Sequence, residues 1–373
     1  MIAFQALFAR CLLGIYWCMG LVPLPPVSQR LRLAVALFIR LIWFAYYTWM
    51  LIIGYSYIWV DRSLSISYIT GTLLHMGYAL LGMLVQMQSI LKQRLYVRLE
   101  DYRIRLQLQM RRLGCSHKCQ RTERLFFLLV AQMSSDIVKT WANSKYNISP
   151  VHVISLPQKW QLRFHFVQLM WQIMELNQRA VELRHSLLRL AAGIDIWQPY
   201  SLPDWKYLQM LRLSYERIYE CHEIFNDCYG WSMLCVQLMC GFEFVANTYW
   251  FVTEAYVSQR IYMFIYNGNT CFAIGTLMTA LFWYGGASAN NSRQIGCLIP
   301  KLVKPLGSKR YNDLVSEFLL QTLHQRFVVT AKDFFSLNLH LLSSMFGAVV
   351  TYLVILIQFM FAEKSSHAAA RPK

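Results

Sequence analysis

The chain has 373 residues, of which 56% are hydrophobic and only 15% are charged, whereas a soluble domain averages about 25% charged residues. Mean hydropathy is +0.33, and the apolar residues form runs long enough to cross a bilayer, which takes about 20 residues each. This composition argues against a cytosolic globular enzyme. The 36 Lys and Arg residues outnumber the 19 Asp and Glu residues, an excess that fits the cytoplasmic loops of a membrane protein better than a nucleic-acid partner. We expect a polytopic membrane protein that binds no nucleic acid.

The amino-terminal segment, residues 1–33, is expected to stay attached and cytoplasmic. An apolar stretch, Cys11–Val22, follows Arg10 as in a signal peptide, but no small-residue cleavage site precedes the Pro23–Pro26 break. We therefore favour an amphipathic helix at the cytoplasmic membrane surface.

Five apolar runs are predicted to cross the membrane. The first contains one base, Arg40, which is expected to snorkel to an interface. The five runs are Leu33–Val60, Ser67–Leu91, Tyr229–Phe251, Ile261–Gly285 and Phe334–Phe361.

Two further segments are more polar. Leu125–Trp141 contains Asp136 and Lys139, and Trp160–Leu176 contains Arg163. Each is either a span or an amphipathic helix on the membrane surface. The chain therefore has seven spans if both cross and five if neither does.

The distribution of basic residues favours a cytoplasmic amino terminus. With seven spans, the cytoplasmic segments hold 26 Lys and Arg residues and the outside segments, with Lys139 counted among them, hold 8, as the positive-inside rule requires. Two Asn-X-Ser/Thr motifs occur, and only Asn147 falls outside in this topology, which makes it the one predicted glycosylation site.

Two cytoplasmic segments carry helical periodicity. Apolar residues recur every three or four positions from Leu95 to Leu113, so the second span is expected to continue into the cytosol. Before the last span, Asn312 is expected to cap a second helix that carries Leu314 and Phe318. Helices that protrude on one side suggest an assembly platform there.

No motif for catalysis or for a cofactor is found. The segment Cys115-Ser-His117-Lys-Cys119 has the residue types of a zinc site but no second pair at suitable spacing, so a solvated turn is favoured over a metal site. We expect neither a metal nor a cofactor.

The last span carries the most specific pattern. The string Thr351-Tyr352-Leu-Val-Ile-Leu-Ile-Gln358-Phe359 closely resembles the terminal-helix signature of insect gustatory receptors, and Ala331-Lys-Asp-Phe-Phe-Ser-Leu-Asn338 resembles the family's approach to that helix. The seven spans, the inside amino terminus and the segment Gly20-Leu-Val-Pro23 are also similar to the family.

The resemblance implies an all-α, seven-transmembrane subunit of a ligand-gated, non-selective cation channel, with cytoplasmic helical extensions that form an anchor for a homo- or heterotetramer of related receptors. Gln358 and Phe359 match positions near the pore constriction. Val354 and Ile355 lie on the helical face of Gln358 and would form an apolar gate, and Thr351 shares that face one turn further in.

The implied ligand is a small-molecule tastant that enters among the other helices from the extracellular side. Ionisable residues within spans usually have a partner or a purpose, which marks Asp136 and Glu243 as pocket candidates; Lys139 is a structural partner for Asp136. The aromatic candidates are Trp171, Tyr249, Trp250 and Tyr262. For them, an interfacial aromatic belt in contact with membrane lipid is the favoured alternative.

The expected organisation is a cytoplasmic segment (1–33), six transmembrane helices with the ligand pocket (34–286), a cytoplasmic anchor segment (287–333), a pore-lining seventh helix (334–362) and an extracellular tail (363–373). The expected location is the plasma membrane of sensory neurons. An odorant receptor of the related channel family and a secondary transporter are the alternatives.

Overall fold

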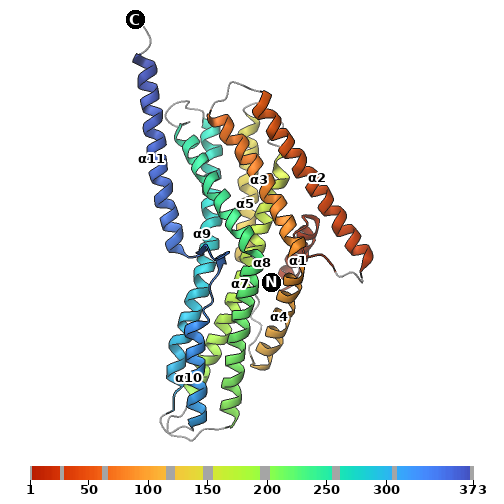
Figure 1. Cartoon of the computed structure of the whole chain (residues 1–373), viewed down its shortest axis with the longest axis vertical. Coiled ribbons are helices and arrows are strands. Elements are labelled where there is room, and N and C mark those ends of the chain that lie inside the picture. Colours follow the sequence, from red (N-terminus) through yellow and green to blue (C-terminus); the bar gives the residue numbers. More distant parts are fainter. Residues whose placement is uncertain are drawn as a thin grey trace.

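The chain folds almost entirely into helices, several of which run side by side along most of the molecule (Figure 1). The computed structural model describes residues 2–25, 29–60, 66–114, 122–145, 154–193, 202–253, 261–304 and 309–369. Within these ranges, the side chains of residues 2–9, 57–60, 66–68, 122–123, 143, 202–203, 356 and 359–369 fall outside the description. The elements are α1 (Ile2–Cys18), α2 (Arg30–Val60), α3 (Ile66–Leu91), α4 (Gln93–Arg112), α5 (Thr122–Ser144), α7 (Leu156–Gly193), α8 (Leu202–Thr253), α9 (Ile261–Leu298), a 3₁₀ turn η2 (Ile299–Leu302), α10 (Lys309–His324), β1 (Thr330–Ala331), β2 (Phe335–Ser336) and α11 (Leu339–Ala369).

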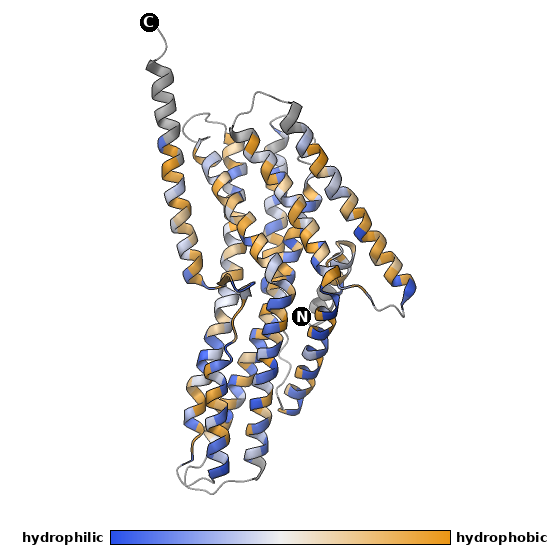
Figure 2. Cartoon of the chain, viewed as in Figure 1, coloured by the Kyte–Doolittle hydropathy of each residue, from blue (hydrophilic) through white to orange (hydrophobic). Residues whose placement is uncertain are grey.

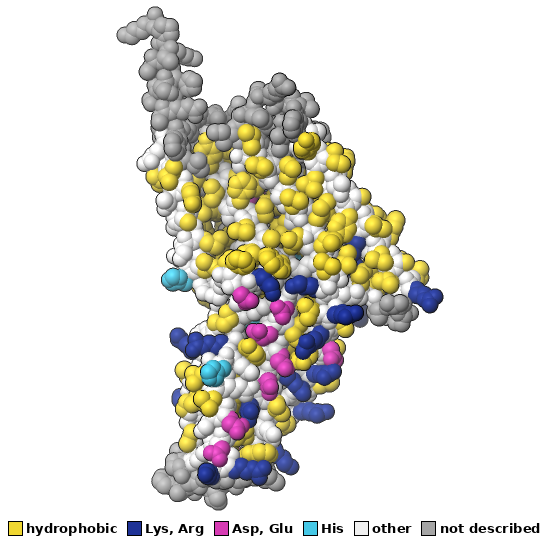
Figure 3. Space-filling view, viewed as in Figure 1, with side chains coloured by type: hydrophobic (Ala, Val, Ile, Leu, Met, Phe, Trp, Pro, Cys, Tyr) yellow, Lys and Arg dark blue, Asp and Glu magenta, His cyan; other side chains and the backbone are white. Residues whose placement is uncertain are grey.

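Three of the helices are longer than a membrane is thick. Helices α7, α8 and α9 contain 38, 52 and 38 residues, so they are roughly 57, 78 and 57 Å long, against about 30 Å for the hydrocarbon core. Figure 3 shows hydrophobic side chains over the upper half of the molecule and most of the charged ones over the lower half, and the ribbon in Figure 2 has the same division. The long helices can therefore cross the membrane and continue beyond it on the side where the charged residues gather.

Hydropathy alone identifies only part of the membrane domain. Among the described residues, α2, α3, α8 and α9 are long and apolar enough to cross, and the described apolar part of α11, Leu339–Ile355, is shorter. Helices α5 and α7 are not among them, yet both pack against α9 inside the bundle. Asp136 and Lys139 are buried there, so the surface-helix alternative is wrong for both segments.

The cytoplasmic continuation of α3 follows the predicted periodicity. The chain turns at Lys92, and α4 then buries Leu99, Leu106 and Met110 against the core. The second predicted helix also forms, as α10, but it begins at Lys309. Asn312 is inside it and exchanges two hydrogen bonds with the backbone of Lys304, at 2.9 and 3.2 Å, so its predicted role as the helix cap was wrong.

Side chains from the bundle hold the segment that follows α1. Gln86 and Gln161 both donate to the carbonyl oxygen of Met19, at 2.7 and 2.9 Å. Arg40 is 2% exposed and donates to the carbonyl oxygen of Val22, so it is buried instead of snorkelling. Gly20 has a φ of +67°, and a Cβ there would lie 2.7 Å from Gln86 Oε1. The amino-terminal segment is therefore part of the packed structure.

The last helix begins later than predicted. Lys332 and Asp333 have φ angles of +47° and +62° and form the turn of the β1–β2 hairpin, which keeps residues 334–338 out of the helix. Asn338 Oδ1 then accepts a 2.8 Å hydrogen bond from the Leu341 backbone and caps α11. Near its start α11 packs on α8, where Phe346 meets Phe244 edge to face, and further along it stands apart from the other helices (Figure 1).

Candidate functional site

A cavity of about 40 Å³ lies in the membrane part of the bundle, where α3, α5, α7, α8 and α9 meet. Its volume is enough for about three water-sized groups and is far below the roughly 300–1,000 Å³ of a drug-sized ligand site. A ligand larger than a few atoms therefore has to part the helices. The lining residues are Tyr78, Leu81, Gln132, Lys159, Leu162, Arg163, Phe166, Val236, Met239, Cys240, Glu243, Ala273, Ile274 and Leu277.

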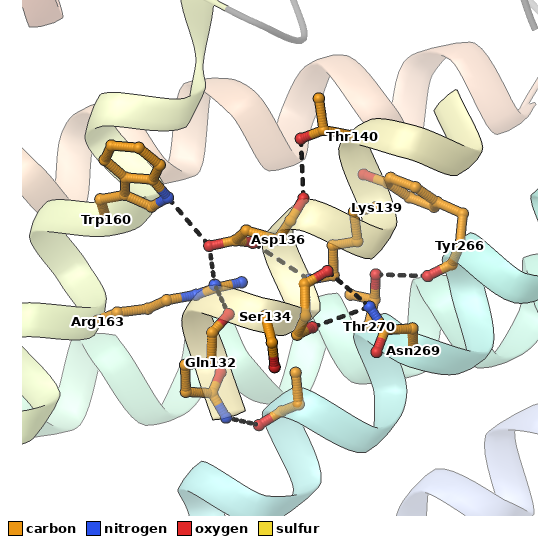
Figure 4. A network of polar contacts seen from close by, with 12 residues as sticks. Gln132, Ser134, Asp136, Lys139, Thr140, Trp160, Arg163, Tyr266, Asn269 and Thr270 are labelled. Carbon is orange, nitrogen blue, oxygen red and sulfur yellow. Dashed lines mark hydrogen bonds and ion pairs between the residues drawn. The ribbon is translucent and has the colours of Figure 1, made fainter. Parts of the chain in front are cut away.

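A buried ion pair between α5 and α7 forms one side of this region (Figure 4). Asp136 Oδ2 accepts hydrogen bonds from Arg163 Nη1 and, at 3.0 Å, from Trp160 Nε1. Lys139 Nζ lies 4.0 Å from the other carboxylate oxygen of Asp136. Because these side chains are at most 11% exposed, each of these charges depends on its partner, and the pair joins the two helices that hydropathy did not identify.

Gln132 connects the ion pair to the cavity. Its amide nitrogen donates to the Ala273 carbonyl oxygen at 3.0 Å and to Thr276 Oγ1 at 3.1 Å, and its backbone carbonyl accepts from Arg163 at 2.9 Å. Gln132 is 2% exposed, and its Oε1 has no hydrogen-bond partner among the described residues. An acceptor left in this state normally costs about 1–3 kcal/mol, so the bundle keeps an unsatisfied polar group next to the cavity.

Two further charges face the cavity. Lys159 of α7 and Glu243 of α8 both line it. Within the described ranges, the Lys159 ammonium makes no ion pair and no side-chain hydrogen bond, although it lies within electrostatic reach of Glu243, Arg163 and Asp136. The Glu243 carboxylate interacts with the Tyr78 hydroxyl from α3. The cavity lining therefore includes a lysine, a carboxylate within its electrostatic reach, and the neutral amide of Gln132.

The predicted pocket residues fall into two groups. Glu243 lines the cavity and Asp136 lies directly behind its wall, paired with the lining residue Arg163. The four aromatic candidates do not line the cavity. Tyr249 and Trp250 lie in the last turn of α8 and Tyr262 in the first turn of α9, edge to face with Trp141; Trp171 packs against the core in the middle of α7.

Sequence reasoning missed Lys159, Gln132 and Tyr78, and it took Arg163 only as a reason to doubt a span. The signal that could have found them was the opposite charge in the two polar spans. Asp136 in one span and Arg163 in the other are most simply explained if the two helices are neighbours.

On α11, the residues predicted for the pore lie on a face that is open in the single chain. Thr351, Val354, Ile355 and Gln358 are all exposed, and Thr351 Oγ1 bonds back to the Gly347 carbonyl oxygen at 3.1 Å. The side chain of Phe359 lies outside the described residues, as do Asn147 and the segment from Cys115 to Cys119. Among the described residues, no group of three His, Cys, Asp or Glu side chains could hold a metal ion.

Comparison with known proteins gives concordant results. The family profile described as "7tm Chemosensory receptor" matches residues 9–363. The chain is 47% identical to gustatory receptor 23a of Drosophila melanogaster over 229 residues, 59% of this chain and 61% of that protein. It is 45% identical to gustatory receptor 68a of the same organism over 58 residues, 16% of this chain and 15% of that protein. The aligned regions thus span less than two thirds of these relatives.

The fold is similar to that of a solved receptor. The olfactory receptor OR5 of the insect Machilis hrabei, in complex with eugenol, has a TM-score of 0.69 at 14% identity and covers 95% of this chain and 99% of its own. The same receptor in a second structure gives a TM-score of 0.67 at 15% identity, covering 96% and 99%. The predicted seven-helix membrane fold is confirmed.

Proposed function

Because the chain belongs to the 7tm chemosensory receptor family, in which its relatives are insect gustatory receptors, we propose that this receptor works as a ligand-gated, non-selective cation channel subunit that detects tastants or contact chemicals in sensory neurons. The chain is a multi-pass membrane chemoreceptor and not an enzyme.

The channel proposal rests on one face of α11 that is exposed in the single chain. In the single chain, Val354 and Ile355 are 48% and 41% exposed, and Gln358 lies exposed on the same face. An amide in an apolar transmembrane helix needs a partner, either another helix or water in a pore. Four copies of α11 around an axis would supply both, with the Gln358 amides solvated by pore water and the next turn as a hydrophobic gate.

The cavity supports a ligand site within each subunit. It lies in the part of the chain expected to hold the pocket, residues 34–286, and it is lined by five helices. Parting these helices to admit a tastant would shift α8 and α9, on which the start of α11 packs. Ligand binding and the pore would thus share the two helices that support α11.

The remaining parts of the organisation stay proposals. Residues 287–333, which include α10, would hold a homo- or heterotetramer together on the cytoplasmic side, and residues 363–373 would form an extracellular tail.

We also propose Asn147 as a glycosylation site, so Asn147→Gln should abolish any shift in electrophoretic mobility after glycosidase treatment.

Recording from cells that express the chain, alone and with related receptors, tests the channel proposal. A panel of sugars, bitter compounds, organic acids and contact chemicals should include ligands that evoke a cation current without any coupled substrate. A current that requires a co-transported ion gradient would instead indicate a transporter.

A further inference from the structure

Two exposed thiols lie on one face of α1. Cys11 and Cys18 are both free and exposed. They are seven residues apart, which is close to two full helical turns, so their side chains point the same way. The side of α1 that packs on the bundle is marked by Leu12 and Tyr16, 1% and 8% exposed, and lies roughly 100–160° around the helix from the thiols. The packing of α1 therefore turns both thiols outward.

Hydrogen bonds place α1 at the boundary of the membrane domain. The carbonyl oxygen of Cys18 accepts from Trp43 Nε1 of α2 at 3.0 Å, and that of Leu24 accepts at 3.1 Å from Gln93, the first residue of α4. In Figure 1, α1 lies beside the junction of α3 and α4, near the level at which the ribbon in Figure 2 changes from mostly hydrophobic to mostly hydrophilic. Because the amino terminus is cytoplasmic, this level is the inner surface of the membrane.

The body of α1 is attached to the bundle more weakly than the segment that follows it. Bundle side chains donate hydrogen bonds to the backbone carbonyls of Met19, Leu21 and Val22. From the described part of the bundle, no side-chain hydrogen bond reaches residues 10–17, where Tyr16 meets Phe164 edge to face. Apolar packing alone therefore holds this part of α1, and a further attachment to the membrane would add to it.

The other described cysteines do not combine exposure with this position. Cys297 is exposed, but it lies 36 residues after the start of α9, about 54 Å along the helix against about 30 Å for the hydrocarbon core. The remaining five are buried or half-buried between helices: Cys221, Cys228, Cys235, Cys240 and Cys271. In the described part of the chain, Cys11 and Cys18 are thus the exposed thiols beside the membrane surface.

We propose that Cys11 and Cys18 are S-acylated by a long-chain fatty acid, as cysteines of juxtamembrane helices commonly are. Each thiol would lose its proton, its sulfur would form a thioester bond to the carbonyl carbon of a long-chain acyl-coenzyme A, and coenzyme A would leave as the free thiol. One acyl chain gives only marginal membrane binding, whereas two give stable anchoring. Two chains on one face of α1 would hold this helix in the cytoplasmic leaflet. The proposal goes beyond the proposed function and does not depend on channel activity.

Acyl exchange on the full-length protein expressed in insect cells tests the assignment. Free thiols are blocked with N-ethylmaleimide, thioesters are cleaved with neutral hydroxylamine, and the released thiols are coupled to a polyethylene glycol maleimide. The wild type should gain two polymers in a hydroxylamine-dependent way, Cys11→Ser and Cys18→Ser one each, and the double variant none. Cys297→Ser is the matched control, an exposed thiol away from the membrane, and it should keep both. A wild type without the shift, or a double variant that keeps both polymers, would overturn the proposal.

Mass spectrometry of the wild type keeps the test decisive if the double variant does not fold. Trypsin cleavage after Arg10 and Arg30 releases a peptide whose two cysteines are Cys11 and Cys18. This peptide should carry two long-chain acyl groups, and both should be lost after hydroxylamine. Acyl groups found only on other cysteines, or an unmodified peptide at normal surface expression, would contradict the proposal.

Discussion

The guanidinium of Arg40, on α2, donates a 2.7 Å hydrogen bond to the carbonyl oxygen of Val22, in the segment that follows α1. The same group reaches Ser89 Oγ of α3 at 3.2 Å. One buried side chain thus fastens the amino-terminal segment to two helices of the membrane domain. Losing such a bond costs more than losing an exposed one. A carbonyl that is removed from water and left without a donor pays its full desolvation cost.

Replacing Arg40 should therefore loosen the amino-terminal segment. We expect Arg40→Ala to lower the free energy of unfolding by about 1–3 kcal/mol and to speed proteolysis near Val22. Thermal unfolding and limited proteolysis of the purified protein measure both effects. Arg32→Ala is the control, since Arg32 is exposed and, among the described residues, bonds only to Gln29. Equal stability of the two variants would show that the Arg40 contact contributes nothing.

Gly285 should be intolerant of a side chain, because the short segment between β2 and α11 passes directly over it. A Cβ at Gly285 would lie 2.7 Å from the Leu337 carbonyl oxygen, whereas one at Gly275 of the same helix would meet only a Phe244 ring atom at 3.9 Å. We expect Gly285→Ala to cost about 1–3 kcal/mol of stability through overpacking, and Gly275→Ala to be neutral or stabilising. The Tm values of the two variants decide the matter; a neutral Gly285→Ala would be inconsistent with the packing described.

His222 should make the cytoplasmic bundle sensitive to acid. It stacks on Phe327 with ring centroids 5.1 Å apart, and burial lowers the pKa of His222 from its ordinary 6.5 to about 4. The unfolded chain therefore binds a proton in a pH range where the folded chain does not, so stability is complete above pH 6.5 and falls as the pH drops toward 4.

At pH 5 this linkage costs about 2 kcal/mol relative to pH 7.5. We expect His222→Phe, which keeps an aromatic ring against Phe327, to lose less stability than the wild type over the same interval. Unfolding profiles at the two pH values measure the difference. Parallel losses in both proteins would mean that His222 is not the group responsible.

The sequence predicted the membrane domain well wherever one segment carried its own signal. The span in α2 and the periodicity of α4 are local patterns, and both elements formed as expected. The later start of α11 depends on a turn at Lys332 and Asp333 with positive φ angles. Asp adopts such angles more often than most residues and Lys does not, so only one of the two residue types hints at this turn. Arg40 was misjudged because its acceptor, the Val22 carbonyl, lies 18 residues earlier on another element.

The candidate site was harder to predict because its residues come from five helices. Glu243 and Asp136 stood out as acids in apolar segments, and both lie at the cavity or next to it. The main partner of Asp136 proved to be Arg163, 27 residues away on α7, with the local Lys139 at 4.0 Å. The neutral Gln132 and Tyr78 give no signal in the sequence. Their role depends on the hydrogen-bonding groups that the neighbouring helices place beside them.

The gate proposal predicts that a polar substitution in the gate opens the channel without ligand. Ile355→Ser should hydrate the apolar turn below Gln358 and give a standing cation current. Leu353→Ser is the matched control, because Leu353 lies two residues away and roughly 160° around the helix. Whole-cell recording without any tastant compares the two. A silent Ile355→Ser at normal surface expression, or a current in both variants, would argue against a gate on this face.

The conductance of Gln358 variants tests most directly whether α11 lines the pore. In the Ile355→Ser background, no ligand is needed, and a fourfold ring at position 358 would place four like charges around the ion path. We predict that Gln358→Glu raises the single-channel cation conductance and that Gln358→Lys lowers it several-fold, with both effects larger at low ionic strength. Equal conductance in the two oppositely charged variants, at low salt and normal surface expression, would remove α11 from the pore.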